Sequence, residues 1–312
     1  MSKNLYLKNK FNSALQNHKT NNFQVAEKLY KKILKTNPNH LNSIFLLGTL
    51  YCQIKNFDKA KYLLKKTIEI NPNHGDAFYN LGIVFNELGN IHKAMNCYKK
   101  TIEINPHHAE AHLNLGNILK NLNEFQKAEN CFNKAIELNP NQVSAYNSLG
   151  LVFNNLGHFS KAKACFKKAI KLNPNYVTVY NSLGLVYDYS GENQKAKKYY
   201  EKAIKLDPNY INAIWNLHQF SSNFDEALLI LKKIINIDKN NIKAKAIISA
   251  IEGYRGDLKS LKSLLLSNES KHPYIRSIKW VFSLPQLPKL YFNRWEFFDE
   301  IIKMTNQSRP FY

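Results

Sequence analysis

The chain has few of the residues from which catalytic and metal centres are built. Its 312 residues include only 4 cysteines and 11 glycines, and no Cys-x-x-Cys pair occurs. A glycine-rich phosphate loop, a nucleophile elbow and a cluster of histidine with carboxylates are all missing. We therefore expect no catalytic residue, no cofactor and no bound metal.

Long apolar runs are missing as well. The opening residues, MSKNLYLKNKFNSALQNHK, lack the apolar core of a signal peptide. No later stretch approaches the roughly 18 apolar residues that a membrane-spanning helix needs. With 44% hydrophobic residues the chain can still bury a substantial core. A cytoplasmic protein without membrane association is expected.

Acidic residues are scarce relative to basic ones. There are 23 Asp and Glu against 44 Lys and Arg, which gives a formal net charge of +21. Such a surplus can indicate an acidic partner such as nucleic acid or anionic lipid. The chain is also rich in Asn, Ile, Tyr and Phe, which is the signature of an AT-rich genome. We attribute the charge mainly to this bias and do not expect nucleic acid as a partner.

The few cysteines follow a regular spacing. Cys97, Cys131 and Cys165 are 34 residues apart, and Cys52 precedes them. Equivalent helices of stacked repeats lie about 9–10 Å or more apart, whereas a disulfide needs alpha carbons within about 7 Å. The cysteines are therefore expected to be small buried or half-buried residues in a reducing compartment.

Proline shows the same period more clearly. Asn or Asp precedes each proline of the series, and the pair is expected to end a helix, because proline lacks an amide donor and disfavours helical geometry in the residue before it. The series is Pro38, Pro72, Pro106, Pro140, Pro174 and Pro208. Between consecutive prolines lie two apolar patterns of helical period joined by a short turn.

Small and large residues alternate within each period. Glycine in the first helix and alanine in the second are expected to permit close helix contact, with large side chains filling the remaining space. The small residues are Gly82, Gly116, Gly150 and Gly184, with Ala60, Ala94, Ala128, Ala162 and Ala196. The large ones are Phe85, Tyr98, Phe132, Phe166 and Tyr200. A helix pair this short must stack on neighbours to complete its core.

These features closely resemble the tetratricopeptide repeat family. The shared features are the 34-residue period, the Leu-Gly pair in the first helix, the alanine in the second helix and the proline at the end of each repeat. The resemblance implies an all-α, right-handed superhelical solenoid of stacked antiparallel helix pairs. It places an array over residues 1–241, with six full repeats in 7–210 and a shortened repeat in 211–241. The full repeats are 7–40, 41–74, 75–108, 109–142, 143–176 and 177–210.

Several segments depart from the family pattern. Lys10, Ser13 and Asn17 stand where bulky residues are expected, which is consistent with a capping repeat. The repeat 211–241 is about three residues short in its first helix and carries His218 where glycine is usual. Residues 242–268 are expected to form one more degenerate helix pair.

One face of each first helix remains for binding. The second, sixth, ninth and thirteenth positions of a repeat point away from the second helix, at about 100° per residue. In repeats two to six none of them is basic. The resemblance places this face in a concave groove, where neutral amides and hydroxyls can bind an extended peptide backbone. The candidate groove residues are Asn80, Asn114, Asn117, Asn121, Ser148, Asn155, Ser182, Tyr189 and Asn216.

Part of this set resembles a known peptide ladder. Asn80, Asn114 and Asn216 are similar to the asparagines just before Leu-Gly or Leu-Ala in O-linked N-acetylglucosamine transferase, which hold substrate peptide. Ser148 and Ser182 take that place in two repeats and interrupt the ladder. A merely solvated helix face is the alternative. Family members that bind acidic chaperone tails use lysines and an arginine here, so that partner class is not expected.

The basic charge lies on the second helix instead. One lysine position recurs in every repeat, and it includes the candidate polyanion ridge of Lys66, Lys100, Lys134, Lys168 and Lys202. Such a ridge could bind along a polyanion. The usual interpretation is a solvated helix face on which the lysine stems cover apolar surface.

His40, His74 and His108 also recur at one position of the repeat. Their separation is too wide for a shared metal ion, and we expect them to pack in the turns between repeats.

The last segment, 269–312, concentrates aromatic residues and proline. It is expected either to cap the solenoid or to be a connector. It looks like the connector that leads into an S-adenosylmethionine-dependent methyltransferase domain in bacterial tetratricopeptide-repeat proteins. The favoured function is a scaffold that binds a protein or peptide partner. The alternative is the recognition arm of a methyltransferase or glycosyltransferase-type enzyme, and polyanion binding comes third.

Overall fold

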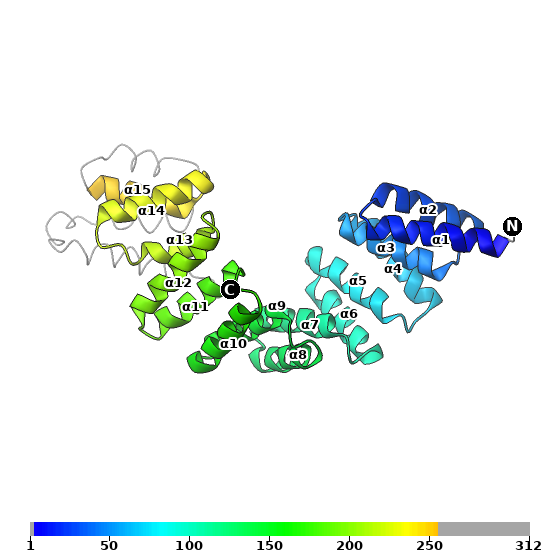
Figure 1. Ribbon diagram of the computed structural model, residues 1–312, viewed down its shortest axis with the longest axis horizontal. Coiled ribbons are helices and arrows are strands. Elements are labelled where there is room, and N and C mark those ends of the chain that lie inside the picture. Colours follow the sequence, from blue (N-terminus) through cyan, green and yellow to red (C-terminus); the bar gives the residue numbers. More distant parts are fainter. Residues whose placement is uncertain (1–2, 255–312) are drawn as a thin grey trace. The chain divides into compact units, whose positions relative to one another are not determined.

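The computed structural model describes residues 3–254, which lie in helices and the short turns that join them, without a strand (Figure 1). The chain divides into two compact units, Met1–His158 and Phe159–Tyr312. The expectations for 255–268 and for the aromatic segment 269–312 lie outside the described residues. No helix within 3–254 is long and apolar enough to cross a membrane.

The first unit contains nine helices among its described residues. They are α1 (Lys3–Lys19), α2 (Phe23–Thr36), α3 (Leu41–Gln53), α4 (Phe57–Ile70), α5 (Gly75–Glu87), α6 (Ile91–Ile104), α7 (Ala109–Asn121), α8 (Phe125–Leu138) and α9 (Val143–Asn155). Each odd-numbered helix from α1 to α7 packs against the next even-numbered one, which in turn packs against the following odd-numbered helix.

The second unit contains six helices up to residue 254. They are α10 (Phe159–Leu172), α11 (Val177–Tyr189), α12 (Asn193–Leu206), α13 (Ile211–His218), α14 (Phe224–Ile237) and α15 (Ile242–Tyr254). Here α11 packs with α12 and α13 with α14, and consecutive pairs are joined by contacts of α12 with α13 and of α14 with α15. The prediction of an all-helical array of packed helix pairs is confirmed.

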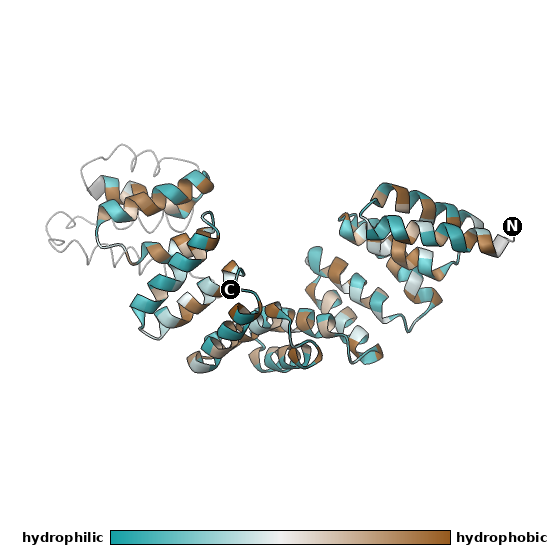
Figure 2. Ribbon diagram, in the orientation of Figure 1, coloured by the Kyte–Doolittle hydropathy of each residue, from teal (hydrophilic) through white to brown (hydrophobic). Residues whose placement is uncertain are grey.

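Hydropathy alternates along most helices, as Figure 2 shows by its changes between brown and teal. This alternation is what helices with one buried face require. The second helices end where the sequence predicted: Asn71 and Asn105 leave helical geometry, with φ of −134° and −132°. Pro72 and Pro106 follow them and disfavour any helical continuation.

The predicted pairing of small and large residues is confirmed where both partners lie in one unit. A Cβ placed on Gly82 would lie 2.6 Å from Tyr98, and one on Gly116 would lie 2.7 Å from Phe132. These distances are shorter than carbon atoms tolerate, so only glycine lets the aromatic ring pack against the first helix. Ala94 and Ala128 in the second helices are fully buried.

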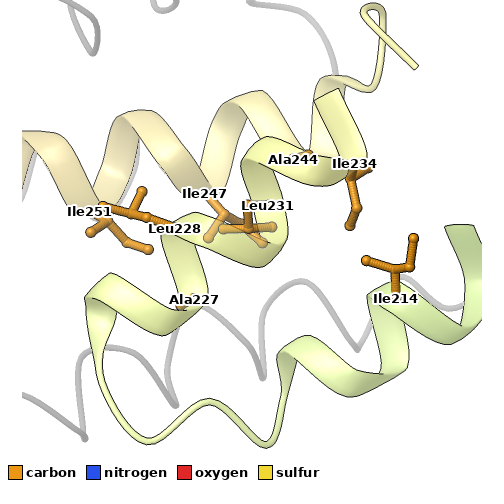
Figure 3. Close-up of a cluster of buried hydrophobic side chains, with 8 residues drawn as sticks. All are labelled: Ile214, Ala227, Leu228, Leu231, Ile234, Ala244, Ile247 and Ile251. Carbon is orange, nitrogen blue, oxygen red and sulfur yellow. The ribbon is translucent and has the colours of Figure 1, made fainter. Parts of the chain in front are cut away.

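The last described helices pack differently. An aliphatic cluster lies between α13, α14 and α15, in which Leu228 and Leu231 face Ile247 and Ile251 (Figure 3). Helix α13 has 8 residues where α11 has 13, which is a larger shortening than the sequence indicated. It stops early because the residues after it turn and cap α14, where Asn223 Oδ1 accepts from the backbone N–H of Glu226 at 2.9 Å.

Candidate functional site

The predicted groove residues all lie on first helices, but they divide between the two units. Those from Asn80 to Asn155 lie on α5, α7 and α9 of the first unit, and Ser182, Tyr189 and Asn216 lie on α11 and α13 of the second. First helices of successive pairs contact one another, α3 with α5 and α7 with α9 in the first unit and α11 with α13 in the second. Each unit therefore has its own first-helix face.

Two residues at the sixth position of their repeats bind the preceding first helix. Asn80 Nδ2 donates to Thr49 Oγ1 at 2.9 Å, and Ser148 Oγ donates to Asn117 Oδ1 at 2.9 Å. The acceptor stands at the ninth position of the preceding repeat in both pairs. These bonds connect neighbouring repeats, so part of the polar capacity of this face is used for stacking.

Asn114 and Asn216 make the same kind of connection to a different acceptor. Asn114 Nδ2 donates to the Tyr79 hydroxyl at 3.3 Å, and Asn216 Nδ2 donates to Asn181 Oδ1 at 2.9 Å. Both acceptors stand at the fifth position of the preceding repeat. Burial, with a smaller contribution from the Glu110 carboxylate, raises the pKa of Tyr79, so its phenol stays neutral and can accept this bond.

Ser148 and Ser182 are almost completely buried. Each is only 7% exposed, and Ser182 Oγ donates to the Thr178 carbonyl of its own helix at 3.0 Å. Helical periodicity placed them on the groove face, but close packing of neighbouring first helices covers them. The two serines are better suited to holding repeats together than to contacting a partner.

The thirteenth position forms the exposed row of the first-helix face. Asn121 and Asn155 are exposed, and within the described part of the chain neither side chain makes a hydrogen bond. Tyr189 takes this position in α11 with 49% of its surface exposed. Gln53, at the same position of α3, lies 2.8 Å from His18 Nε2 through its Oε1. The amides of Asn121 and Asn155 thus retain their full hydrogen-bonding capacity.

Acidic side chains occupy the ends of this face in the first unit. Asp76 and Glu110 are exposed and lie 3.7 Å and 3.6 Å from the two ring nitrogens of His108. Glu87 is also exposed, at the end of α5. The face is therefore neutral to acidic in a chain whose net charge is strongly positive.

The recurring histidines have a role that the sequence analysis missed. His40, His74 and His108 are the N-caps of α3, α5 and α7, and each Nδ1 accepts from a backbone N–H three residues later, at 3.3, 3.3 and 3.2 Å. Each ring also packs on an aromatic residue of the preceding first helix, such as Phe45 against His74 with centroids 4.4 Å apart. The signal was present: a polar residue directly before the first apolar residue of a helix.

The lysine ridge is not uniform. Lys66 Nζ donates to the Pro38 carbonyl at 3.2 Å, and Lys100 and Lys134 pair with Glu103 and Glu137, each at 2.8 Å. Lys168 and Lys202, in the second unit, are exposed. The first three lysines of the ridge are therefore engaged with groups of their own chain.

The four cysteines are buried or half-buried between packed helices. Burial raises the pKa of the Cys52, Cys97 and Cys131 thiols to about 11, which keeps them protonated and unreactive near neutral pH. Among residues 3–254, no group of three or more His, Cys, Asp or Glu side chains is arranged to hold a metal ion.

Comparison with known proteins agrees with this architecture. Residues 7–244 match the profile of the family described as cilia and flagella-associated protein 70 C-terminal domain. No curated protein matches the chain.

Similar solved structures include a tetratricopeptide repeat protein from Parabacteroides merdae, 20% identical, covering 78% of this chain and 97% of that one with a TM-score of 0.62. Another is pilF of Pseudomonas aeruginosa, with 22% identity, coverage of 66% and 96%, and a TM-score of 0.57. A third is YrrB, described as a TPR protein with an unusual peptide-binding site, with 21% identity, coverage of 60% and 96%, and a TM-score of 0.52. At these identities the likeness shows the fold.

Proposed function

The chain belongs to the tetratricopeptide-repeat family of the cilia and flagella-associated protein 70 C-terminal domain, and we propose that it is a scaffold that binds an extended peptide segment of a partner protein on its first-helix face. The observation that carries this proposal is the exposed row of amides at the thirteenth position. Asn121 and Asn155 are exposed on successive first helices, α7 and α9, which are in contact.

The chemistry of this row suits a peptide backbone. A primary amide offers two donors and one acceptor, which match the carbonyl and N–H of a peptide without demanding a particular side chain. The inter-repeat bonds of Asn80 and Asn114 each use one amide donor. Each of these two amides keeps one donor and its acceptor. A bound segment can therefore form hydrogen bonds both with the exposed row and with these less exposed amides.

The charge of the face narrows the class of partner. It carries Asp76, Glu87 and Glu110 and no lysine or arginine in repeats two to six. A neutral or weakly basic segment is favoured over the acidic tails that some family members bind, because like charges repel. YrrB, which shares the fold, is described as having an unusual peptide-binding site, and this supports peptides as the ligand class.

A selection of displayed random peptides on the full chain tests the proposal. Peptides that bind should lose affinity for the Asn121→Ala/Asn155→Ala variant, by about 0.5–1.5 kcal/mol for each lost hydrogen bond. Affinity should change little between low and moderate salt, because the bonds are made by neutral groups. Fluorescence anisotropy with one synthetic peptide from the selection measures both effects.

The matched control uses asparagines on the opposite helices. Asn96 and Asn130 are exposed on α6 and α8 of the same unit, so Asn96→Ala/Asn130→Ala changes the same chemistry away from the proposed face. This variant should bind like the parent. If the two double variants lost affinity equally, or if only the control lost it, the first-helix face would not be the binding site.

A further inference from the structure

A pocket lies in the first unit between the second helices α2 and α4, with the first helix α3 as its floor. Its volume is about 400 Å³, which lies within the range of sites that enclose a small molecule or a side chain. Leu47 and Tyr51 of α3, each 3% exposed, form the floor, and Tyr62 and Leu63 of α4 form one wall. We call it the tyrosine pocket, after its two aromatic rings.

Tyr62 distinguishes this pocket from the equivalent places on the following repeats. Its side chain is 67% exposed. Asparagine and cysteine take the positions of Tyr62 and Leu63 in the next two repeats, as Asn96 and Cys97 in α6 and Asn130 and Cys131 in α8. An exposed ring adds little to the core of its own chain, whereas tyrosine is enriched among the residues that contribute most to binding at protein interfaces.

The two carboxylates beside the tyrosine pocket are already paired. Glu27 accepts from Lys31 Nζ at 2.6 Å and from the Tyr51 hydroxyl at 2.7 Å, and these bonds hold the pKa of its carboxyl below the ordinary value. Asp58 pairs with Lys61 at 3.2 Å. Each of the two carboxylates therefore has a cation of its own chain.

The cations around Tyr62 outnumber these carboxylates. Three further lysines lie within about one turn of Tyr62 on α4 and form no ion pair within residues 3–254, namely Lys59, Lys65 and Lys66. The ammonium of Lys59 lies 5.3 Å from the centroid of the Tyr51 ring, beside the space that an occupant would fill. Glu69, the next carboxylate on this face of α4, stands about two turns from Tyr62.

We propose that the tyrosine pocket binds an aromatic side chain of a partner protein that is flanked by acidic residues. The ring of the occupant can stack on Tyr62 and face the Lys59 ammonium, which an aliphatic side chain cannot do. Carboxylates next to that ring can pair with the lysines around Tyr62, so charge complementarity favours an acidic segment over a basic one.

The tyrosine pocket is separate from the first-helix face. Leu47 and Tyr51 stand at positions 7 and 11 of their repeat, whereas the first-helix face consists of positions 2, 6, 9 and 13. The remaining lining residues belong to second helices. This proposal therefore does not depend on the function proposed for the first-helix face.

A polypeptide fits the tyrosine pocket better than a single-stranded nucleic acid, which also combines rings with negative charge. Residues 3–254 contain no arginine, the residue whose planar guanidinium binds phosphate through two parallel hydrogen bonds. Single strands bind along a series of aromatic side chains on which successive bases stack, but asparagine replaces Tyr62 in α6 and α8. One isolated aromatic site suits one side chain.

Binding of short labelled peptides to the full chain tests the proposal by fluorescence anisotropy. The probe is Glu-Glu-Trp-Glu-Glu with an amidated C-terminus, which should bind saturably and more weakly as salt rises. Glu-Glu-Ala-Glu-Glu keeps the charge and should bind at least about tenfold more weakly, because the ring is lost. Gln-Gln-Trp-Gln-Gln keeps the ring and should also bind more weakly at low salt, because the charges are lost.

The decisive variant is Tyr62→Asn/Leu63→Cys. It gives α4 the residues that α6 and α8 carry at these positions and is therefore compatible with the fold. Its affinity for the probe should fall about tenfold or more, because an aromatic wall of the pocket is removed. The matched control is Tyr6→Asn, since Tyr6 is 47% exposed on α1 of the same unit and does not line the pocket. The control should bind like the parent.

A second pair of variants tests the charge of the rim. Lys59→Glu should weaken binding of the probe by about tenfold, because a cation beside the ring becomes an anion. Lys93→Glu makes the same change at the equivalent exposed position of α6. It should weaken binding by less than about threefold, because charges about a Debye length away are largely screened.

Four results would overturn the proposal. They are no saturable binding of the probe, equal affinity for the peptides with and without tryptophan, equal losses for a pocket variant and its matched control, and tighter binding of a five-nucleotide thymidine oligomer than of the probe at the same salt. Circular dichroism of each variant verifies the helical fold. Asn121→Ala/Asn155→Ala should leave binding of the probe unchanged, which separates the tyrosine pocket from the first-helix face.

Discussion

Helices α13 and α14 of the second unit make the contact between first and second helix differently from the pairs of the first unit. In the first unit, glycine at the eighth position of α5 and α7 receives the ring of Tyr98 or Phe132 from the second helix. In α13, His218 stands at the eighth position and is only 3% exposed, while the matching residue of α14 is the smaller Leu231. The bulk of the contact thus lies on the second helix in α6 and α8 and is divided between the two helices in α13 and α14, and close packing penalises voids and overlap in both arrangements.

The units also differ in how their first helices begin. The side chains of His40, His74 and His108 cap three helices of the first unit. In the second, Tyr176 and Tyr210 stand at the same place and make no side-chain capping bond. The same repeat architecture therefore has side-chain helix caps on three first helices of the first unit and lacks them on α11 and α13. The variants below test these differences, in order of decreasing effect.

The largest effect is expected at the glycine contacts. Gly116→Ala places a methyl group 2.7 Å from Phe132, and Gly184→Ala places one 2.5 Å from Tyr200. Each should lower the free energy of unfolding by about 1–3 kcal/mol through overpacking, even though alanine favours helices over glycine by about 1 kcal/mol. Gly75→Ala is the control, because its methyl group would make an ordinary contact at 3.4 Å with Ile104. Urea unfolding that ranked Gly75→Ala as the most harmful change would contradict this packing.

The second effect concerns the buried histidine of the second unit. Burial, with a smaller contribution from Lys243, lowers the pKa of His218 from 6.5 to about 4. The unfolded chain takes up a proton below pH 6.5 and the folded chain does not, so stability is lost as the pH falls from 6.5 towards 4. From pH 7 to pH 5 the loss should be about 2 kcal/mol.

Thermal unfolding at the two pH values measures this loss. His218→Phe keeps an aromatic ring beside Trp215, whose ring centroid lies 5.7 Å from that of the histidine, and removes the titrating group. The variant should lose about 2 kcal/mol less than the parent on the same change of pH. An identical pH dependence in parent and variant would show that His218 is not the group responsible.

A smaller effect is expected at the helix caps of the first unit. His74→Ala removes the acceptor of the Ala77 N–H and should cost about 0.5–2 kcal/mol. His74→Asn supplies another good capping acceptor and should recover most of the loss. Gln142→Ala is the matched control, since Gln142 precedes α9 and makes no side-chain capping bond. Chemical unfolding in which all three variants were equally destabilised would argue against the capping role.

The smallest effect on the free energy of unfolding is expected for single asparagines of the first-helix face. It distinguishes an asparagine that bonds to the neighbouring repeat from one that is exposed. Asn80→Ala breaks the bond to Thr49 and should cost about 0.5–1.5 kcal/mol of stability. Asn121→Ala should change the free energy of unfolding by less than about 0.5 kcal/mol, because the side chain is exposed and bonds to no residue within 3–254. A double-mutant cycle of Asn80→Ala with Thr49→Val isolates the pair. No coupling energy between them would mean that the bond does not stabilise the repeats.

Much of the fold follows from the sequence because the rules involved are local. Asn-Pro and Asp-Pro pairs predicted the ends of second helices, and Asn71 and Asn105 do leave helical geometry there. The spacing of Gly82 and Tyr98 predicted a close contact between the helices of one pair, which the structure confirms. Each inference needed only the preferences of a few neighbouring residues and the period of the helix.

The state of the predicted groove residues was decided by tertiary structure. Periodicity assigned Asn80, Asn121 and Ser148 to one face. The stacking of repeats then buried Ser148, bonded Asn80 to Thr49, and left Asn121 exposed. These outcomes depend on separations of a few ångströms between side chains 31 or more residues apart. Helical period determines the direction in which a side chain leaves its own helix, while its partner is determined by how closely the next helix packs.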